Sequence, residues 1–178
     1  MPANPQDIDL MARTMVAENR SGSPDEYAAI AHVMRSRLLS GNASFGDGRA
    51  PTRMLDVLMA PTKPGGAYKQ FTPWGLDVRD QNGGRTTNNP LNVDLRSPAY
   101  QSAYHIASDV MSGNSNDPTN GAVNYHATSM KTPPSWAKGR KGQQIGQHTF
   151  YGPAKTDDVD YSHLIRKPQP SQVAGEET

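Results

Sequence analysis

The side chain best placed to do chemistry is that of Glu18, which stands at the end of an apolar segment just before a tight turn. Apolar residues ahead of it recur at the spacing that buries one stripe of a helix: Ile8, Met11, Ala12, Met15 and Val16. We therefore expect Glu18 to project from the edge of a buried stripe, where partial burial and the negative end of the helix dipole both raise a carboxyl pKa. A carboxyl group that stays protonated near neutral pH suits a general acid, whereas the alternative reading is a solvated glutamate in the last helical turn.

Aromatic, amide and hydroxyl side chains gather in two later segments, a loop at 68–74 and a short apolar stretch at 122–126. Loop aromatics either anchor the loop to the core or form a platform on which a sugar ring stacks. An acid on one side and stacking aromatics with amides on the other is a glycoside-cleaving layout. The candidate sugar-binding residues are Gln70, Thr72, Trp74, Asn124, Tyr125 and His126.

Other chemistries lack their signatures. No glycine-rich phosphate loop follows a strand, and neither Gly-x-Ser-x-Gly nor His-Glu-x-x-His occurs. The chain has no cysteine, which excludes disulfides, a thiolate nucleophile and cysteine-bound zinc. A metal site of His126, His148 and a carboxylate is conceivable, but none of the five histidines has ligand spacing, so we predict no metal and no cofactor. A serine nucleophile with a histidine base has no local signature either. The net charge of +1 gives no electrostatic case for nucleic acid.

Four helices are expected to carry these groups. Asn4 and Pro5 begin the first helix, Ser23 and Glu26 form a capping box for the second, and Gly41 ends the second. Their expected ranges are 5–19, 24–40, 52–59 and 98–112. On the second helix we expect Arg35 and Arg37 to form the solvated face and His32 to be structural rather than a ligand.

A small antiparallel β-element is expected to follow, with a strand at 122–126 pairing with another at 145–151. Only 34% of the residues are hydrophobic, and there are 16 glycines and 15 prolines, so the core must be small and the loops long. We predict a predominantly helical α+β domain over residues 1–152. Residues 153–178 form a polar tail that docks on a partner or stays disordered.

At this point the chain resembles a known family. Four landmarks occur in order: Ala17-Glu18 followed by Gly22, then Gln70-Phe71-Thr72, then Gly121 to His126, then Ile145 to Tyr151. They resemble those of the SleB-like cell wall hydrolases, of the spore-cortex-lytic enzyme type, a branch of the lysozyme-like superfamily. The likeness spans about residues 8 to 152. The chain departs from it at Asn19-Arg20-Ser21, in the long 75–96 insertion, and at His126, where many members have another aromatic residue.

The resemblance implies a lysozyme-like domain that cleaves the MurNAc–GlcNAc β-1,4 bond, with peptidoglycan glycan strands as its partner. It also implies that Glu18 is the catalytic acid, that Gln70 and Thr72 lie near it, and that Tyr125 lines the sugar groove. With a second carboxylate about 5 to 9 Å away, hydrolysis is expected. Without one, the 6-hydroxyl of the sugar attacks and leaves a 1,6-anhydro end, which is lytic transglycosylation. We favour this single-glutamate route, because no motif supports any candidate second acid: Asp25, Asp47, Asp56, Asp77 or Asp80.

How the protein would reach the wall also follows from the sequence. We find no signal peptide and no apolar run of the roughly 18 residues that span a membrane. We therefore expect cytoplasmic synthesis, with delivery by lysis or as a virion component. The competing reading is a non-enzymatic structural component of a phage or gene-transfer particle that retains the fold. The basic, proline-rich loop at 131–142 and the tail would then dock on virion or tail proteins.

Overall fold

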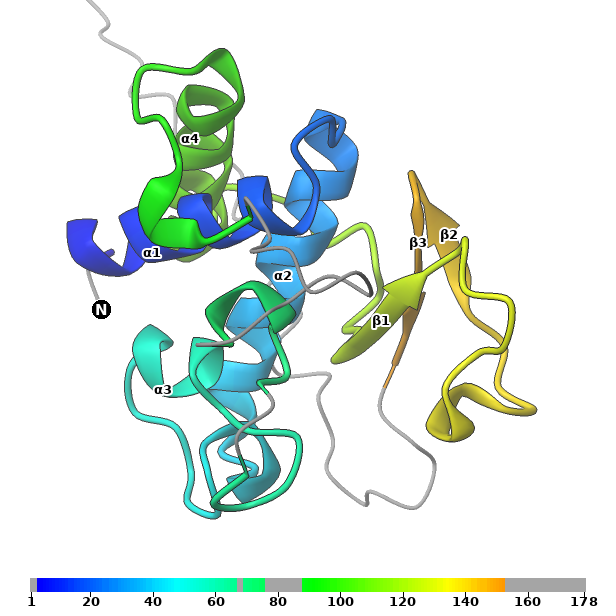
Figure 1. The fold of residues 1–178 in the computed structure, drawn as a ribbon. Coiled ribbons are helices and arrows are strands. Elements are labelled where there is room, and N and C mark those ends of the chain that lie inside the picture. Colours follow the sequence, from blue (N-terminus) through cyan, green and yellow to red (C-terminus); the bar gives the residue numbers. More distant parts are fainter. Residues whose placement is uncertain (1–2, 67–68, 76–87, 153–178) are drawn as a thin grey trace, which may run out of the picture.

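The computed structural model describes residues 3–66, 69–75 and 88–152. Over these residues the chain forms four α-helices and a three-stranded antiparallel sheet (Figure 1). The helices are α1 (Pro5–Glu18), α2 (Pro24–Ser40), α3 (Met54–Leu58) and α4 (Pro98–Ser112). Each lies within two residues of its predicted range, and the predominantly helical α+β architecture is confirmed. None of the described helices is long and apolar enough to cross a membrane.

Short-range capping explains why the helix ends were predictable. The side chains of Asn4, Ser23 and Ser97 each accept a hydrogen bond from a backbone N–H in the first turn of the helix that follows. Gly41 and Gly113 adopt left-handed conformations, with φ of 65° and 79°, directly after α2 and α4. Both kinds of cap depend on residues adjacent in the sequence.

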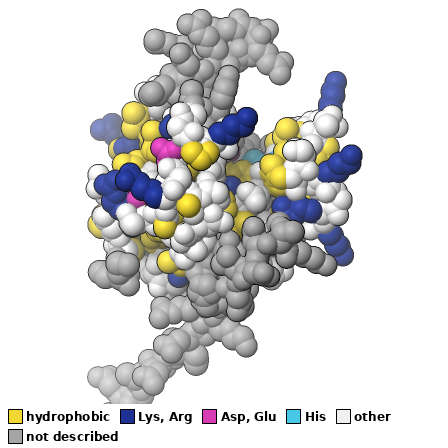
Figure 2. Space-filling view, turned by 90° about the horizontal axis from the view of Figure 1, so that it is seen from below, with side chains coloured by type: hydrophobic (Ala, Val, Ile, Leu, Met, Phe, Trp, Pro, Cys, Tyr) yellow, Lys and Arg dark blue, Asp and Glu magenta, His cyan; other side chains and the backbone are white. Residues whose placement is uncertain are grey.

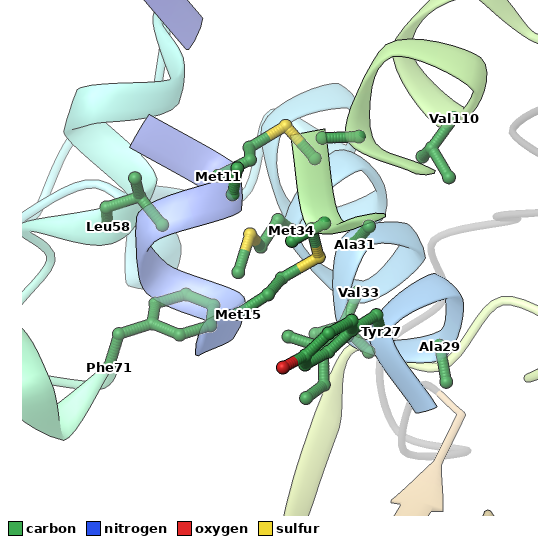
Figure 3. Close-up of a cluster of buried hydrophobic side chains, with 14 of the residues drawn as sticks. Met11, Met15, Tyr27, Ala29, Ala31, Val33, Met34, Leu58, Phe71 and Val110 are labelled. Atoms are coloured by element: carbon green, nitrogen blue, oxygen red, sulfur yellow. The ribbon is translucent and has the colours of Figure 1, made fainter. Parts of the chain in front are cut away.

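A methionine-rich core holds the helices together. Met11 and Met15 of α1 and Met34 of α2 are fully buried, and Figure 3 shows their side chains lying between the helices. Their flexible, polarizable side chains fill irregular gaps between elements. Phe71, from the aromatic loop, is fully buried in the same cluster. For Phe71 the anchoring interpretation of that loop is therefore correct.

The sheet differs from the prediction at its second strand. β1 (Asn124–Ala127) begins two residues later than expected, and the single strand predicted at 145–151 is wrong. That segment contains the end of β2 (Gln143–Ile145) and all of β3 (His148–Tyr151), which pair antiparallel in the order β1-β3-β2. The reason is Gly146, whose φ of 58° lets the chain reverse between the two strands. Alternation continues through both arms of the hairpin and so conceals the turn.

The two faces of the sheet have different environments. Tyr125, His148 and Phe150 share the inner face, and Phe150 belongs to the helical core. His126 and Tyr151 share the opposite face, called here the outer face, on which Trp136 of the β1–β2 loop packs. In Figure 1 the sheet stands on one side of α2, with α1, α3 and α4 on the other. Much of the predicted 75–96 insertion and all of the predicted 153–178 tail lie outside the described residues.

Candidate active site

Glu18 is the last residue of α1 and lies where α1, α2 and β1 meet. Its side chain is partly exposed, and its carboxyl group is in hydrogen-bonding contact with the Tyr125 hydroxyl of β1. Burial raises the pKa of Glu18 to about 7, although the Tyr125 hydrogen bond and the positive charge of Arg37 both lower it. The direction is the one the sequence predicted, and burial is the largest cause. Both the protonated and the ionised form of Glu18 are therefore accessible near neutral pH.

The turn after Glu18 is fixed by close packing. The Tyr27 hydroxyl of α2 donates a hydrogen bond to the carbonyl of Asn19, at 2.9 Å. Gly22 lies against the same ring, and a Cβ at this position would be 2.4 Å from a ring carbon. The glycine therefore allows α2 to pack close to the chain that leaves Glu18.

Arg37 is the cation of the site, and its prediction as a solvated residue is wrong. Only 6% of Arg37 is exposed. Its Nε donates to the Val123 carbonyl at 2.6 Å, and its other nitrogens to Oε1 of Gln70 at 3.2 Å and Oδ1 of Asn124 at 3.4 Å. Those partners lie 33 to 87 residues away, so the α2 sequence alone could not show that this face is covered.

The charge of Arg37 is retained despite this burial. Its guanidinium lies 5.1 Å from the ring centroid of Phe45 and 4.9 Å from that of Phe71, in cation–π contact with both. Burial lowers the pKa of Arg37 to about 10, with Tyr125 and Glu18 acting in the opposite direction. Because this pKa stays well above neutrality, Arg37 supplies a fixed positive charge beside Glu18.

The predicted sugar-binding amides are engaged within the protein. Gln70 accepts from Arg37 and donates through Nε2 to the carbonyls of Ser44, at 2.6 Å, and Pro61, at 3.0 Å. Asn124 accepts from Arg37. Both side chains therefore hold Arg37 in place, and this is the role that the contacts support.

Thr72 and Trp74 belong to a single 3-10 turn, Thr72–Trp74, which packs on α1. The Trp74 indole N–H donates to Oγ1 of Thr14, at 2.8 Å, and the ring is partly exposed. Thr14 is four residues before Glu18, so the two side chains share one face of α1. Trp74 thus lies along the face that ends at Glu18. The Thr72 side chain is exposed.

His126 is not brought together with Glu18. It lies on the outer face of the sheet, where its Nε2 is 3.1 Å from the Tyr151 hydroxyl and its ring stacks on Tyr151 at 5.6 Å. His148 faces the opposite way, so these two histidines cannot share one metal ion. No cluster of three metal-ligating side chains occurs in the described parts of the chain.

Glu26 is a buried carboxylate that sequence reasoning missed. Only 2% of it is exposed, and its oxygens accept from Nδ2 of Asn19 at 2.9 Å, the backbone N–H of Gln147 at 2.8 Å and Nδ1 of His148 at 2.7 Å. The predicted capping box is half right: Ser23 caps the Glu26 N–H, but the Glu26 carboxylate faces the β2–β3 hairpin. His148 is 122 residues away, so no local signal could reveal the pair.

The contacts of Glu26 connect the end of α1, which carries Glu18, with the sheet, which carries Tyr125. Asn19 directly follows Glu18, and the His148 ring lies edge-on to Tyr125 with centroids 5.1 Å apart. Glu26 therefore links the end of α1 to β3, the strand that pairs with the one carrying Tyr125. A Cβ at Gly146 would lie 2.6 Å from the carboxyl carbon of Glu26, so this close approach requires glycine.

The predicted second carboxylates have other surroundings. Asp25 is exposed, Asp47 accepts from the backbone N–H of Gly65, and Asp56 caps α3. Hydrogen bonds, first of all from the Thr52 backbone, lower the pKa of Asp56 to about 2. Within the described residues, no carboxylate is among the groups that shift the pKa of Glu18. Two further candidates, Asp77 and Asp80, lie outside that part of the chain.

A comparison with known families adds independent evidence. Residues 22–151 match the family model described as Cell Wall Hydrolase, which covers most of the chain and confirms the family resemblance. The match begins four residues after Glu18, so it bears on the scaffold that holds this glutamate and not on the glutamate itself. No curated protein and no solved structure matches the chain.

Proposed function

Because the chain belongs to the cell wall hydrolase family, we propose that it cleaves the MurNAc–GlcNAc β-1,4 bond of peptidoglycan with Glu18 as the catalytic acid. The observation that carries this proposal is the Glu18 carboxyl group, with its pKa near 7, held between the Tyr125 hydroxyl and the Arg37 cation. A general acid works best when its pKa lies near the working pH.

In the first step Glu18 gives its proton to the glycosidic oxygen as the bond from that oxygen to C1 of MurNAc breaks. The carboxylate that forms is stabilised by the Tyr125 hydrogen bond and by the charge of Arg37, both of which favour the ionised form. In the second step this carboxylate takes the proton of the MurNAc 6-hydroxyl, whose oxygen bonds to C1. Glu18 is then protonated again, and the product carries a 1,6-anhydro end.

Within the part of the chain that the structure describes, the surroundings of the other carboxylates support this single-glutamate route over hydrolysis with a second acid. Among the described carboxylates, Glu26 is the one whose charge, like that of Glu18, acts on Tyr125. However, it is 2% exposed and its oxygens are already occupied by three donors, so it has no access to a sugar. A hydrolytic muramidase is the second candidate, and carriage by a virion remains a prediction from the sequence.

Product analysis tests the proposal. Purified sacculi are digested at pH 6 in water enriched in oxygen-18, and the released muropeptides are identified by mass spectrometry. Transglycosylation gives unlabelled 1,6-anhydro ends, whereas hydrolysis gives reducing ends that carry the heavy oxygen. Reducing ends alone would overturn the single-glutamate route. No fragments from a folded sample would contradict enzymatic function and favour the structural-component reading.

A further inference from the structure

The charge of the chain is unevenly distributed. Residues 118–152, called here the β lobe, contain four basic residues and not one aspartate or glutamate. Since the whole chain carries +1, the remainder carries −3. The basic residues of the lobe are Lys131, Lys138, Arg140 and Lys141. All four lie in the loop between β1 and β2, so the positive charge is concentrated on one segment.

This loop is packed onto the outer face of the sheet. The Trp136 ring meets Tyr151 edge-on, with centroids 5.4 Å apart, and lies 6.0 Å from His126. Arg140 lies over the Tyr151 ring and donates to the carbonyls of Trp136 and Gly152. The aromatic contacts and the Arg140 hydrogen bonds attach the loop to the sheet, so the loop carries its basic residues on this side of the lobe.

The outer surface of the loop combines cations with apolar side chains. Trp136 is 40% exposed and Met130 is 46% exposed, while Lys131, Lys138 and Lys141 are exposed beside them. Within the described residues, none of the three lysines forms an ion pair with a carboxylate. Figure 2 shows basic and apolar side chains over this lobe, with no acidic side chain among them.

We propose that this surface is a second wall-binding site, which holds an anionic sugar polymer of the cell wall away from Glu18. An exposed indole stacks on a sugar ring, and the lysines pair with the carboxylates that peptidoglycan carries. The site is separate from the catalytic one, because Tyr125 and Trp136 lie on opposite faces of the sheet. Binding here would keep the enzyme on its substrate by effective concentration. The choice of the cell wall as the polymer rests on the proposed function.

The test is binding to purified sacculi, measured by sedimentation with the full chain carrying Glu18→Gln so that the sacculi stay intact. The test variant adds K131Q, K138Q and K141Q, and the matched control instead adds R49Q, K63Q and R96Q, which remove three exposed charges from the rest of the chain. At low salt we expect the test variant to bind about tenfold more weakly than the control, as three exposed ion pairs would produce. Half-molar salt should abolish the difference, because it screens surface charges. Equal binding of the two variants at low salt would overturn the proposal.

Two treatments of the sacculi identify the anion. Carbodiimide coupling to a neutral amine converts the carboxylates of the sacculi into uncharged amides, and mild acid removes phosphate-linked polymers. Loss of the lysine-dependent binding after amidation of the carboxylates is the expected result. Loss only after mild acid, or binding that survives both treatments, would overturn the proposal. The stacking contact is tested by the fluorescence of Trp136, obtained by subtracting the spectrum of Trp136→Phe from that of the parent protein. Glycan fragments should shift this emission, whereas an unchanged emission would mean that the contact is absent. Cleavage is not needed for any of these readouts, so failure of the catalytic proposal would be seen separately.

Discussion

The raised pKa of Glu18 means that its ionised form is unfavourable in the folded protein. Replacing it with glutamine should therefore stabilise the fold above neutral pH. The folded-state pKa is about 7, against 4.5 for an unperturbed glutamate. Because the folded value is the higher of the two, the contribution of Glu18 to stability is complete below pH 4.5 and is lost as the pH rises through about 7. Glutamine carries no charge and escapes this loss.

The size of the effect follows from the same values. One pKa unit corresponds to about 1.36 kcal/mol, so the rise from 4.5 to about 7 corresponds to about 3 kcal/mol. The side chain is partly exposed, and water screens some of the penalty, so we expect a gain of about 2 kcal/mol at pH 8. In a domain of this size that is a rise in melting temperature of roughly 4 to 8 °C.

Urea unfolding of the wild type and Glu18→Gln at pH 4, 6 and 8 measures this effect. The two proteins should be about equally stable at pH 4 and should diverge as the pH rises. Asp56→Asn is the control of opposite sign, because the lowered pKa of Asp56 gives stability above pH 3.8 that is lost as the pH falls through about 2. Removing that capping carboxylate should cost about 1 kcal/mol at neutral pH. A Glu18→Gln protein no more stable than the wild type at pH 8 would refute the reasoning.

Two further predictions concern the supports of the site. Gly146→Ala should destabilise the protein by about 1–3 kcal/mol more than Gly139→Ala in urea unfolding, because both have positive φ but only at Gly146 would a Cβ collide with Glu26. Equal losses would mean that the Glu26 contacts tolerate the displacement. Tyr125→Phe should raise the pKa of Glu18, because it removes a hydrogen bond that favours the carboxylate. The alkaline limb of the pH–rate profile for peptidoglycan cleavage should then move to higher pH, and an unmoved limb would separate Tyr125 from Glu18 in function.

The helices could be predicted from the sequence because their determinants are local. Ser23 caps α2 from the position directly before it, and Gly41 ends it from the position directly after. The spacing of Met11 and Met15 marks the buried stripe of α1 within about two turns of Glu18. Each of these signals spans only a few residues.

The errors arose where the deciding contact was distant in sequence. Arg37 is buried because Val123, Gln70 and Asn124 supply acceptors for it. Glu26 turns toward the hairpin because His148 and the Gln147 N–H meet it there. A charged residue on a helix is usually solvated, so the default interpretation fails when the fold provides partners from other segments.

For the same reason the structure brings only some of the predicted site residues together. Glu18 and Tyr125 are brought into contact from positions that the ordered landmarks had marked. Alternation along β1 places His126 on the other face, which the strand pattern could have revealed once Tyr125 was assigned inward. Whether Thr72 and Trp74 touch a sugar remains a prediction.

The most direct test of the central claim is the rate at which Glu18→Gln solubilises purified peptidoglycan. Asp109→Asn is the matched control, because it neutralises an exposed carboxylate on α4 that is not among the candidate second acids. Both variants are compared with the wild type after their melting temperatures confirm that they are folded. If Glu18 is the catalytic acid, Glu18→Gln should lose at least about 10²-fold in rate while Asp109→Asn keeps the wild-type rate. A Glu18→Gln rate within a few fold of the wild type would contradict the claim.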